Sequence, residues 1–281
     1  MFVDYEFSED TTGHIGRVKF PYGIYNEIID TRALQWSVSL PLVYAGETDF
    51  TYDAYNGIGV DHRIDLGKNG RLLLQGFAGN IYVPPNPTSN PPFPAQAGLA
   101  NLVAITNDHH VVGGKITWET PVEGLRLLVS ANQTLVVTTA DNGQVPNQGG
   151  HENRIMLSVD YIHDALDLKA EYNYHKYPGL AGFDNEKSKG WYVQAGWESG
   201  KWKPYARFDA VVLDQDASSD PSYYQRSLVL GIGRRIASNL NFRIEDAFNH
   251  GYALPVAAGE TAIGAGKTNW QLYSASINFM F

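Results

Sequence analysis

The sequence predicts an all-β protein, a transmembrane antiparallel up-and-down β-barrel formed as a single domain over residues 1–281. Three observations support this prediction. Apolar and polar residues alternate with a period of two along nearly the whole chain, and a helical period is almost absent. Short and long connections alternate between the strands, as in barrels that cross a bilayer. Gly (28 residues) and Tyr (17) are abundant whereas Met (3) is rare, which is typical of strands and turns.

The alternation defines about thirteen strands of roughly nine to eleven residues, the length that crosses a bilayer when tilted. In ENRIMLSVDYIHD (residues 152–164), Ile155, Leu157 and Val159 fall on one face of the strand, and polar residues such as Asp160 fall on the other. The same pattern recurs, in chain order, in FVDYEF (2–7), GKITWE (114–119), LRLLVSAN (125–132), DLKAEYNYHK (167–176), GWYVQAGWES (190–199), KWKPYARFDA (201–210), SLVLGIGR (227–234), LNFRIED (240–246) and NWQLYSASINFMF (269–281).

The connections between these strands are of two kinds. Long ones are rich in Pro, Gly and Asn, as in NIYVPPNPTSNPPFPAQAGLANLVAITND (80–108) and TADNGQVPNQGG (139–150). Short turns at one rim and long loops at the other are typical of outer-membrane barrels. The predicted short connections are Ser8 to His14, Leu66 to Gly70, Pro121 to Gly124, His163 to Leu166, Ser199 to Lys201 and Ala237 to Asn239.

Aromatic residues on the apolar faces cluster beside the short connections. This is where a barrel carries the aromatic girdle that lies at the membrane interface. The predicted girdle residues are Trp118, Tyr161, Trp197, Trp202, Phe279 and Phe281. A soluble β-sandwich would also alternate. The alternative is therefore a soluble all-β carbohydrate-binding protein, in which Trp191, Trp197 and Trp202 would stack on sugars.

Composition excludes several classes of protein. The chain has no Cys, so disulfides, zinc-thiolate sites and thiol nucleophiles are excluded. Its formal charge of −9 argues against nucleic acid as a partner, because phosphate binding requires a basic face. No stretch of 18 apolar residues predicts a transmembrane helix. The start of the chain, FVDYEFSED after Met1, lacks the basic and apolar regions of a signal peptide.

Motifs for catalysis or metal binding are weak. His109 and His110 are adjacent on a predicted strand, so they point to opposite faces and form a poor metal pair. The sequence contains no HExxH or GxSxG motif and no glycine-rich phosphate loop that opens a helix. We therefore expect no metal, no cofactor and no catalytic residue.

Two segments resemble a known family. The ending NWQLYSASINFMF (269–281) resembles the C-terminal signature of Gram-negative outer-membrane proteins, with a terminal Phe and apolar residues at every second position. The segment GRVKFPYGIYNEIIDTR (Gly16 to Arg32) resembles the corresponding segment of porins related to the phosphate-selective and dicarboxylate-type porins. In that family this segment leaves a strand and enters a loop that can fold into the pore.

The resemblance implies an outer-membrane porin without enzymatic activity, a passive channel for small hydrophilic solutes. It also implies contact with outer-membrane lipid, recognition of the C-terminal strand by the barrel-assembly machinery, and a homotrimer. An outer-membrane barrel enzyme that hydrolyses lipids or esters is the alternative from a different class, and a hydrolytic assay would distinguish it.

Projecting the polar positions inward predicts the residues that line the pore. The predicted cations slightly outnumber the predicted anions, which favours a weak preference for anionic solutes because rings of charge set pore selectivity. Opposite charges that pair across the wall would serve a polar interior equally well. The predicted pore-lining residues are Arg17, Lys19, Arg63, Arg71, Lys115, Arg126, Arg154, Asp160, Lys169, Glu171, Arg207, Asp209, Arg243 and Glu245.

Arg17 and Lys19 receive particular weight because they share a face and precede the loop from Tyr22 to Asp53. Folded inward, this loop would narrow the pore, and Trp36 could anchor it. Its predicted constriction residues are Glu27, Asp30 and Arg32.

The direction of the strands yields a further expectation. If the short turns are periplasmic, the first strand, FVDYEF, descends toward the periplasm. Barrels of this kind have an even number of strands and begin with an ascending one. We therefore expect an odd number of strands to precede Met1. The resemblance to these porins implies about sixteen strands in the complete barrel, so that three would precede Met1.

Overall fold

A computed structural model describes most of the chain as one antiparallel sheet with short 3₁₀ turns. The described residues are 2–29, 31, 35–44, 54–82, 105–140, 148–177, 186–216, 218–253 and 267–279. The strands are β1 (Phe2–Ser8), β2 (Thr11–Lys19), β3 (Ala54–Asp65), β4 (Arg71–Tyr82), β5 (Ile105–Glu119), β6 (Leu125–Ala140), β7 (Gln148–His163), β8 (Leu166–Tyr177), β9 (Glu186–Trp197), β10 (Trp202–Val212), β11 (Tyr224–Ala237), β12 (Leu240–Gly251) and β13 (Asn269–Phe279).

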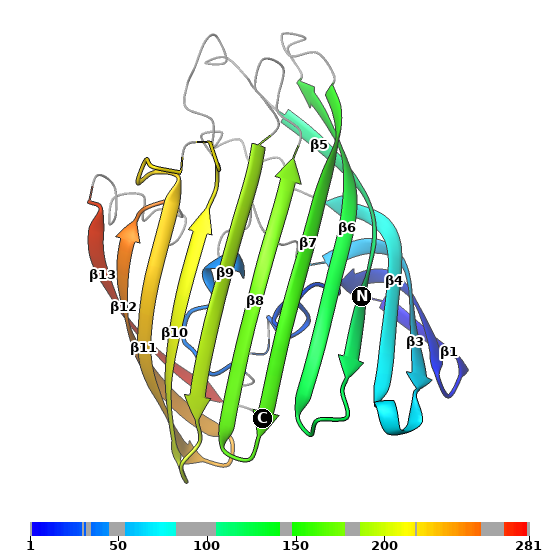
Figure 1. Ribbon diagram of the computed structural model, residues 1–281. Helices are drawn as coiled ribbons and strands as arrows, with labels where there is room; N and C mark the ends of the chain where they lie inside the picture. Colours follow the sequence, from blue (N-terminus) through cyan, green and yellow to red (C-terminus); the bar gives the residue numbers. More distant parts are fainter. Residues whose placement is uncertain are drawn as a thin grey trace.

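In the described part of the chain the sheet contains 13 strands in sequence order, β1 to β13, and each neighbouring pair is antiparallel. This is the predicted up-and-down arrangement, and the predicted number of strands is confirmed. Figure 1 shows the sheet curving strongly around an inner face. Within the described residues β1 and β13 are the two edges of the sheet. Strands before Met1 stay a prediction.

Several strands are longer than predicted. β6 and β7 each have 16 residues, and β5 has 15. β4 ends at Tyr82 and β5 begins at Ile105, so both ends of the segment 80–108 that we assigned to a loop belong to strands. The reason is that the hydrogen bonds between two antiparallel strands can continue past the membrane-spanning length. They do so as long as both strands remain paired, and the composition of those residues does not prevent it.

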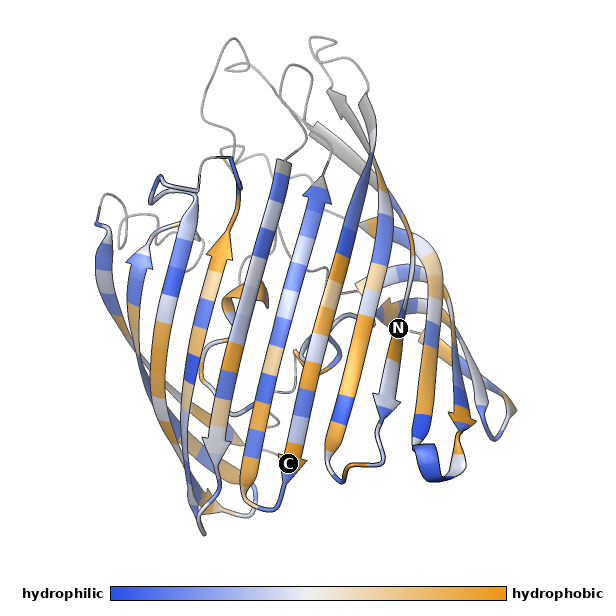
Figure 2. Cartoon of the chain, viewed as in Figure 1, coloured by the Kyte–Doolittle hydropathy of each residue, from blue (hydrophilic) through white to orange (hydrophobic). Residues whose placement is uncertain are grey.

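The two faces of the sheet differ in chemistry. On the outer face Ile155, Leu157 and Val159 of β7 are 43–49% exposed. On the inner face of the same strand Arg154 and Asp160 are at most 2% exposed. Figure 2 shows this alternation as stripes of apolar and polar residues along the strands. An apolar outer face around a polar interior is what a bilayer requires of a β-sheet.

Short turns join the strands at the rim where Figure 1 places the turns between β5 and β6 and between β7 and β8. The turn after β3 contains the 3₁₀ helix η4 (Gly67–Asn69). In the turn after β5, Gly124 has φ 78°, and a Cβ there would lie 1.8 Å from the Ile162 carbonyl oxygen. This position therefore requires glycine, because no side chain fits between the two backbones.

A segment between β2 and β3 folds against the inner face of the sheet. We call its described part, residues 20–29, 31 and 35–44, the inner segment; it contains the 3₁₀ helices η1 (Asn26–Ile28) and η3 (Leu42–Tyr44). Phe20, Tyr22, Tyr25, Val43 and Tyr44 are buried in a cluster that also includes inward-facing residues of β3, β4, β5, β7, β9 and β10. In Figure 1 this segment lies behind β7, β8 and β9. The core of the protein is thus the contact between the inner segment and the sheet.

In the described part of the chain, helices of the length and apolarity needed to cross a membrane are absent.

Candidate functional site

Glu171 on β8 forms the first anchor of the inner segment. Its carboxylate accepts hydrogen bonds from the Ile24 amide (2.9 Å) and the Tyr44 hydroxyl (2.5 Å), which lie at opposite ends of the segment. Within the wall it also accepts from Ser158 (2.5 Å) and Tyr192 (2.9 Å). The Tyr44 hydroxyl in turn accepts from the Ile24 amide at 2.9 Å. Glu171 therefore closes the segment into a loop and fastens both ends to the wall.

Arg207 on β10 forms the second anchor. Its Nη1 donates to Ser37 Oγ and to the Ser39 carbonyl oxygen, both at 2.9 Å. Its Nη2 donates to Ser39 Oγ (3.0 Å) and the Leu40 carbonyl oxygen (3.1 Å). Its Nε donates to Asp209 at 2.8 Å. The planar guanidinium can satisfy several acceptors in fixed directions, so it holds this part of the segment in one orientation.

Two carboxylates of the wall bind amides of the same stretch. Glu245 on β12 accepts from the Val38 amide at 2.8 Å and from the Ser39 amide at 2.9 Å. Asp209 accepts from the Leu42 amide at 3.0 Å. The wall therefore supplies acceptors for backbone donors and, through Arg207, donors for backbone carbonyls. A stretch outside helix and strand needs such partners because buried backbone groups must be hydrogen-bonded.

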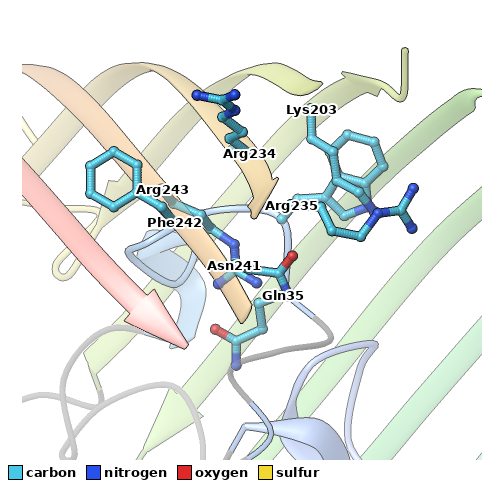
Figure 3. Close-up of a pocket in the computed structure, with 9 residues that line it drawn as sticks. Gln35, Lys203, Arg234, Arg235, Asn241, Phe242 and Arg243 are labelled. Carbon is cyan, nitrogen blue, oxygen red and sulfur yellow. The ribbon is translucent and has the colours of Figure 1, made fainter. Parts of the chain in front are cut away.

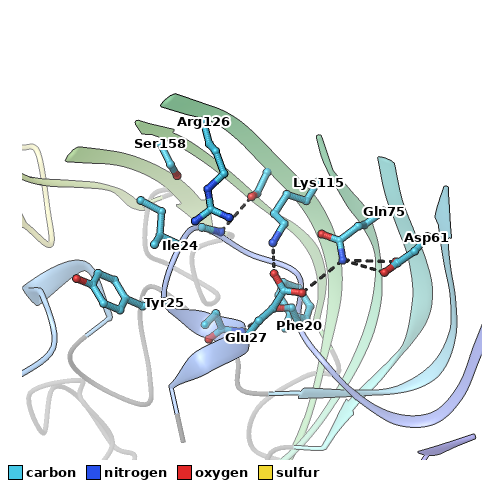
Figure 4. A network of polar contacts seen from close by, with 12 residues as sticks. Phe20, Ile24, Tyr25, Glu27, Asp61, Gln75, Lys115, Arg126 and Ser158 are labelled. Atoms are coloured by element: carbon cyan, nitrogen blue, oxygen red, sulfur yellow. Dashed lines mark hydrogen bonds and ion pairs between the residues drawn. The ribbon is translucent and has the colours of Figure 1, made fainter. Parts of the chain in front are cut away.

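A third group of contacts joins η1 to β3, β4 and β5. Lys115 on β5 forms an ion pair with Glu27, and Gln75 Nε2 lies 3.4 Å from Glu27 Oε1. Gln75 also contacts Asp61 on β3 at 3.3 Å. Figure 4 shows Glu27 between Lys115 and Gln75, with Asp61 beyond them on the next strand. The predicted constriction residue Glu27 thus projects from the inner segment toward predicted pore-lining residues of the wall.

The wall between β6 and β8 carries a row of opposite charges. Arg126 Nε lies 3.1 Å from Asp160, and Lys169 lies 3.2 Å from Asp160 and 2.6 Å from Asp167. Asp160, Asp167 and Lys169 are buried, whereas the Arg126 side chain is 46% exposed. In this row Arg126 presents the accessible positive charge.

A buried polar row lies above Glu171 on β7, β8 and β9. Arg154 is paired with Glu152, and His175 Nε2 lies 2.7 Å from Glu152 Oε1. Ser188 Oγ lies 3.4 Å from His175 Nδ1. All four side chains are buried. The order Ser, His, Glu is that of a hydrolytic triad, but the closed surroundings leave no access for a substrate to Ser188.

The structure contradicts the inward assignment of Arg17 and Lys19. Their register pairs them with Asn56 and Ala54, so Arg17 falls on the outer face with Ile15, which is 59% exposed. Val18 between them packs on the inner cluster. The prediction places only polar residues on the inner face. Where the inner segment covers the wall, that face is instead apolar at the end of β2, and Arg17 and Lys19 are turned outward.

The other predicted pore-lining residues lie on the inner face but differ in accessibility. Arg154, Arg207 and Asp209 are at most 2% exposed, and Lys115, Lys169, Glu171, Arg243 and Glu245 are also buried. Arg71 pairs with Glu119 at 3.4 Å on the exposed short-turn rim, and Arg63 is exposed on β3. Most of the wall charges are thus covered by the inner segment rather than presented to solvent. Asp30, Arg32 and Phe281 lie outside the described residues.

Trp36 of the inner segment is fixed against the wall. A Cβ at Gly196 of β9 would lie 2.6 Å from the indole, so the ring rests directly on this glycine. The ammonium group of Lys203 lies 5.1 Å from the indole centroid, a distance that allows a cation–π interaction. The prediction that Trp36 could anchor the loop agrees with these contacts.

A small pocket opens between Trp36 and the short-turn ends of β10, β11 and β12. Among its lining residues are four cations, Lys203, Arg234, Arg235 and Arg243, and no carboxylate. Glu198 beside it pairs with Lys203 at 2.7 Å and lies 3.6 Å from Arg235. Figure 3 shows Lys203, Arg235 and Arg243 around the pocket and Arg234 directed away from it. The cations directed toward this pocket are therefore Lys203, Arg235 and Arg243.

The predicted girdle residues that the structure describes lie beside the short turns. Trp197 and Trp202 are about half exposed, and Phe279 is also exposed on the face that carries Tyr273 and Ile277. Trp118 donates from Nε1 to the Asn69 carbonyl oxygen at 3.0 Å. Tyr161 stacks on His163 next to the turn between β7 and β8. These positions are consistent with an interfacial role, which stays a prediction.

Burial raises the pKa of three phenols in the inner segment, those of Tyr22, Tyr25 and Tyr44, above the ordinary value of 10.0. For Tyr44 the nearby Glu171 carboxylate raises the pKa further. Because the docked phenols resist ionisation, their contribution to docking is complete below pH 10. It is lost as the pH rises above that value, where a released segment would ionise.

Sequence reasoning missed Ser37, Ser39, Tyr44, Tyr192 and Tyr205. One available signal was the inward position of Tyr192 and Tyr205 on strands whose other aromatic residues face outward. An aromatic residue on an otherwise polar inner face indicates that another segment of the chain packs against that side chain. Both hydroxyls donate to anchor carboxylates, Tyr192 to Glu171 and Tyr205 to Glu245.

Comparison with known families places the middle of the chain among porins. Residues 124–207 match the family described as phosphate-selective porin O and P. This range runs from the turn before β6 into β10 and includes Asp160, Glu171 and Arg207. No match was found among curated protein sequences.

Solved structures of outer-membrane proteins share the fold. OmpT of Vibrio cholerae aligns with 97% of this chain and 76% of its own, at 11% identity and a TM-score of 0.55. An anion-selective porin from Comamonas acidovorans aligns with 96% of this chain and 74% of its own, at 11% identity and a TM-score of 0.59. Salmonella typhi OmpF aligns with 99% of this chain and 77% of its own, at 13% identity and a TM-score of 0.56.

The family match over residues 124–207 and the shared fold confirm the predicted resemblance to porins and the outer-membrane β-barrel type of fold.

Proposed function

We propose that this protein is an outer-membrane porin in which the inner segment narrows the passage, and that small hydrophilic solutes cross it by passive diffusion with a weak preference for anions. The observation that carries the proposal is the inner segment itself. It is fastened to the wall at Glu171 and Arg207, inside a sheet whose outer face is apolar. A segment packed against the inner face occupies part of the interior and so reduces the cross-section of the passage.

The preference for anions follows from the charges that remain accessible. Most inner-face acids are used by the anchors or by buried ion pairs. Arg126 is 46% exposed in its side chain, and the open pocket beside Trp36 is lined by cations and by no carboxylate. Solvent-accessible cations raise the local concentration of anions in a narrow passage. The structural relative from Comamonas acidovorans is an anion-selective porin, which agrees with this proposal.

Bilayer recordings of the purified protein test the proposal. In a salt gradient, stepwise openings with an anion-selective reversal potential are expected. Lys203→Gln combined with Arg235→Gln should shift the reversal potential toward cations, because two accessible positive charges are lost. Glu198→Gln is the matched control at the same pocket and should shift it the opposite way. Identical reversal potentials for all three proteins would refute the anion preference.

We propose that no chemical step accompanies passage. The row of Ser188, His175 and Glu152 is the arrangement that favours the hydrolase alternative. Its burial and the long Ser188 to His175 contact support a structural role. Hydrolysis of ester or phospholipid substrates that disappears in Ser188→Ala would contradict this part of the proposal.

The outer face argues against the soluble carbohydrate-binding alternative. Trp191, Trp197 and Trp202 lie on the same outer face as exposed Val193 and Leu228. A soluble protein would expose this large apolar surface to water. In a bilayer the same surface meets lipid.

We also propose a homotrimer, by analogy with related porins. Crosslinking of the protein in native outer membranes tests this assembly, and a product no larger than a dimer would contradict it.

A further inference from the structure

Arg207 differs from the other wall charges in what it binds. Its side chain is buried, and its three nitrogens together contact Ser37, Ser39 and Leu40 of the inner segment and Asp209 of the wall. Two of its acceptors are backbone carbonyl oxygens. The guanidinium therefore fixes the path of the backbone as well as the serine side chains.

Asp209 and Glu245 complete this arrangement from the same part of the wall. They accept the amides of Val38, Ser39 and Leu42, so donors and acceptors alternate along one short stretch of backbone. Glu171 acts elsewhere, at Ile24 and Tyr44. The stretch from Ser37 to Leu42 thus takes its polar contacts with the wall from Arg207, Asp209 and Glu245 together.

We infer that Arg207 is the positioning residue that fixes the middle of the inner segment and thereby sets the width of the passage. The effect on passage rests on the channel proposed above, whereas the positioning does not. Lysine cannot replace arginine in this role. An ammonium group has three donors and no planar fork, so it cannot reproduce the five contacts of Arg207.

A single cysteine reports the position of the segment independently of any channel activity. The sequence contains no Cys, so Val43→Cys introduces the sole thiol. Val43 is 0% exposed and packs against β9, where a Cβ at Gly190 would lie 2.9 Å from Val43 Cγ1. A thiol-reactive maleimide therefore labels the introduced thiol only when the segment leaves the wall.

Three variants are made in the Val43→Cys background. Arg207→Lys keeps the charge and removes the fork, and Arg207→Met with Asp209→Asn removes the buried pair as a unit so that no unpaired charge is left. Arg71→Lys is the matched control, because Arg71 pairs with Glu119 at the rim and its side chain is 58% exposed. Heat-dependent mobility in gel electrophoresis confirms that each barrel is folded.

Labelling of the introduced thiol should become about tenfold faster or more in both Arg207 variants and stay unchanged in Arg71→Lys. In bilayers, the same two variants should show an altered single-channel conductance, with an increase expected, and should admit larger neutral polymers. Equal labelling rates in folded proteins would overturn the inference. Faster labelling with unchanged conductance in an active channel would also overturn it, because the segment would then move without changing the width. A silent wild-type channel would refute the proposed function, while the labelling would still decide whether Arg207 positions the segment.

Discussion

Tyr44→Phe removes one oxygen atom that links the two ends of the inner segment to the wall. The hydroxyl donates to Glu171 at 2.5 Å and accepts from the Ile24 amide at 2.9 Å. A hydrogen bond to a charged group contributes about 1.5 to 3 kcal/mol. The Ile24 amide keeps its second acceptor, Glu171 Oε1 at 2.9 Å, so it is not left without a partner. We therefore expect docking of the segment to weaken by about 2 kcal/mol.

Hydrogen exchange measures this change directly. Backbone amides exchange when a region opens locally, and about 1.4 kcal/mol corresponds to a tenfold change in the open population. Amides of residues 20–29 should then exchange about 30-fold faster in Tyr44→Phe. Tyr172→Phe is the matched control, because Tyr172 is 41% exposed on the outer face of β8. Unchanged exchange in residues 20–29, or an equal rise in the strands β7 and β8, would refute the role assigned to Tyr44.

Three further predictions concern the wall and the segment as a whole. Gly124→Ala should lower the unfolding temperature more than Gly200→Ala, since both have positive φ but only Gly124 has a backbone atom within 4 Å of the added Cβ. Leu157→Lys on the outer face should cost about 2 to 4 kcal/mol in a bilayer, measured by refolding into lipid vesicles against Ser219→Lys at an exposed loop position. Above pH 10 the three buried phenols of the inner segment should stay un-ionised in ultraviolet titration, and docking should weaken by about 1.4 kcal/mol per phenol and pH unit.

The sheet was predictable because a bilayer imposes one rule on every strand. Alternation placed Leu157 and Val159 outward and Asp160 inward, and the structure agrees. The number of strands and the short turns follow from the same rule together with turn chemistry. The alternation of apolar outward and polar inward residues fails where the inner segment, and not water, contacts the inner face of the sheet. At β2, Val18 packs on the inner cluster and Arg17 turns outward, because the neighbour that decides the face lies far away in the sequence.

The position of the inner segment could not be predicted for a related reason. Its main partners are separated from it by long stretches of sequence: Arg207 contacts Ser37 and Ser39, and Glu171 contacts Ile24 and Tyr44. These contacts go largely to backbone groups, which every residue possesses, so no motif in the segment marks them. The charged residues of the wall were visible in the sequence, but their use as anchors was not.

Because many wall charges bind the inner segment or each other, they contribute less to ion selectivity than their number suggests. A charge whose hydrogen-bonding capacity is taken up by buried partners presents little net field to a passing ion, since its partner carries the opposite sign nearby. Arg207 with Asp209, and Lys169 with Asp160, belong to this group. A count of inward-facing cations and anions therefore overstates what a solute meets. The charges that act on a solute are those still in contact with water, such as Arg126 and Lys203, and substitutions there should alter selectivity more than substitutions among the buried pairs.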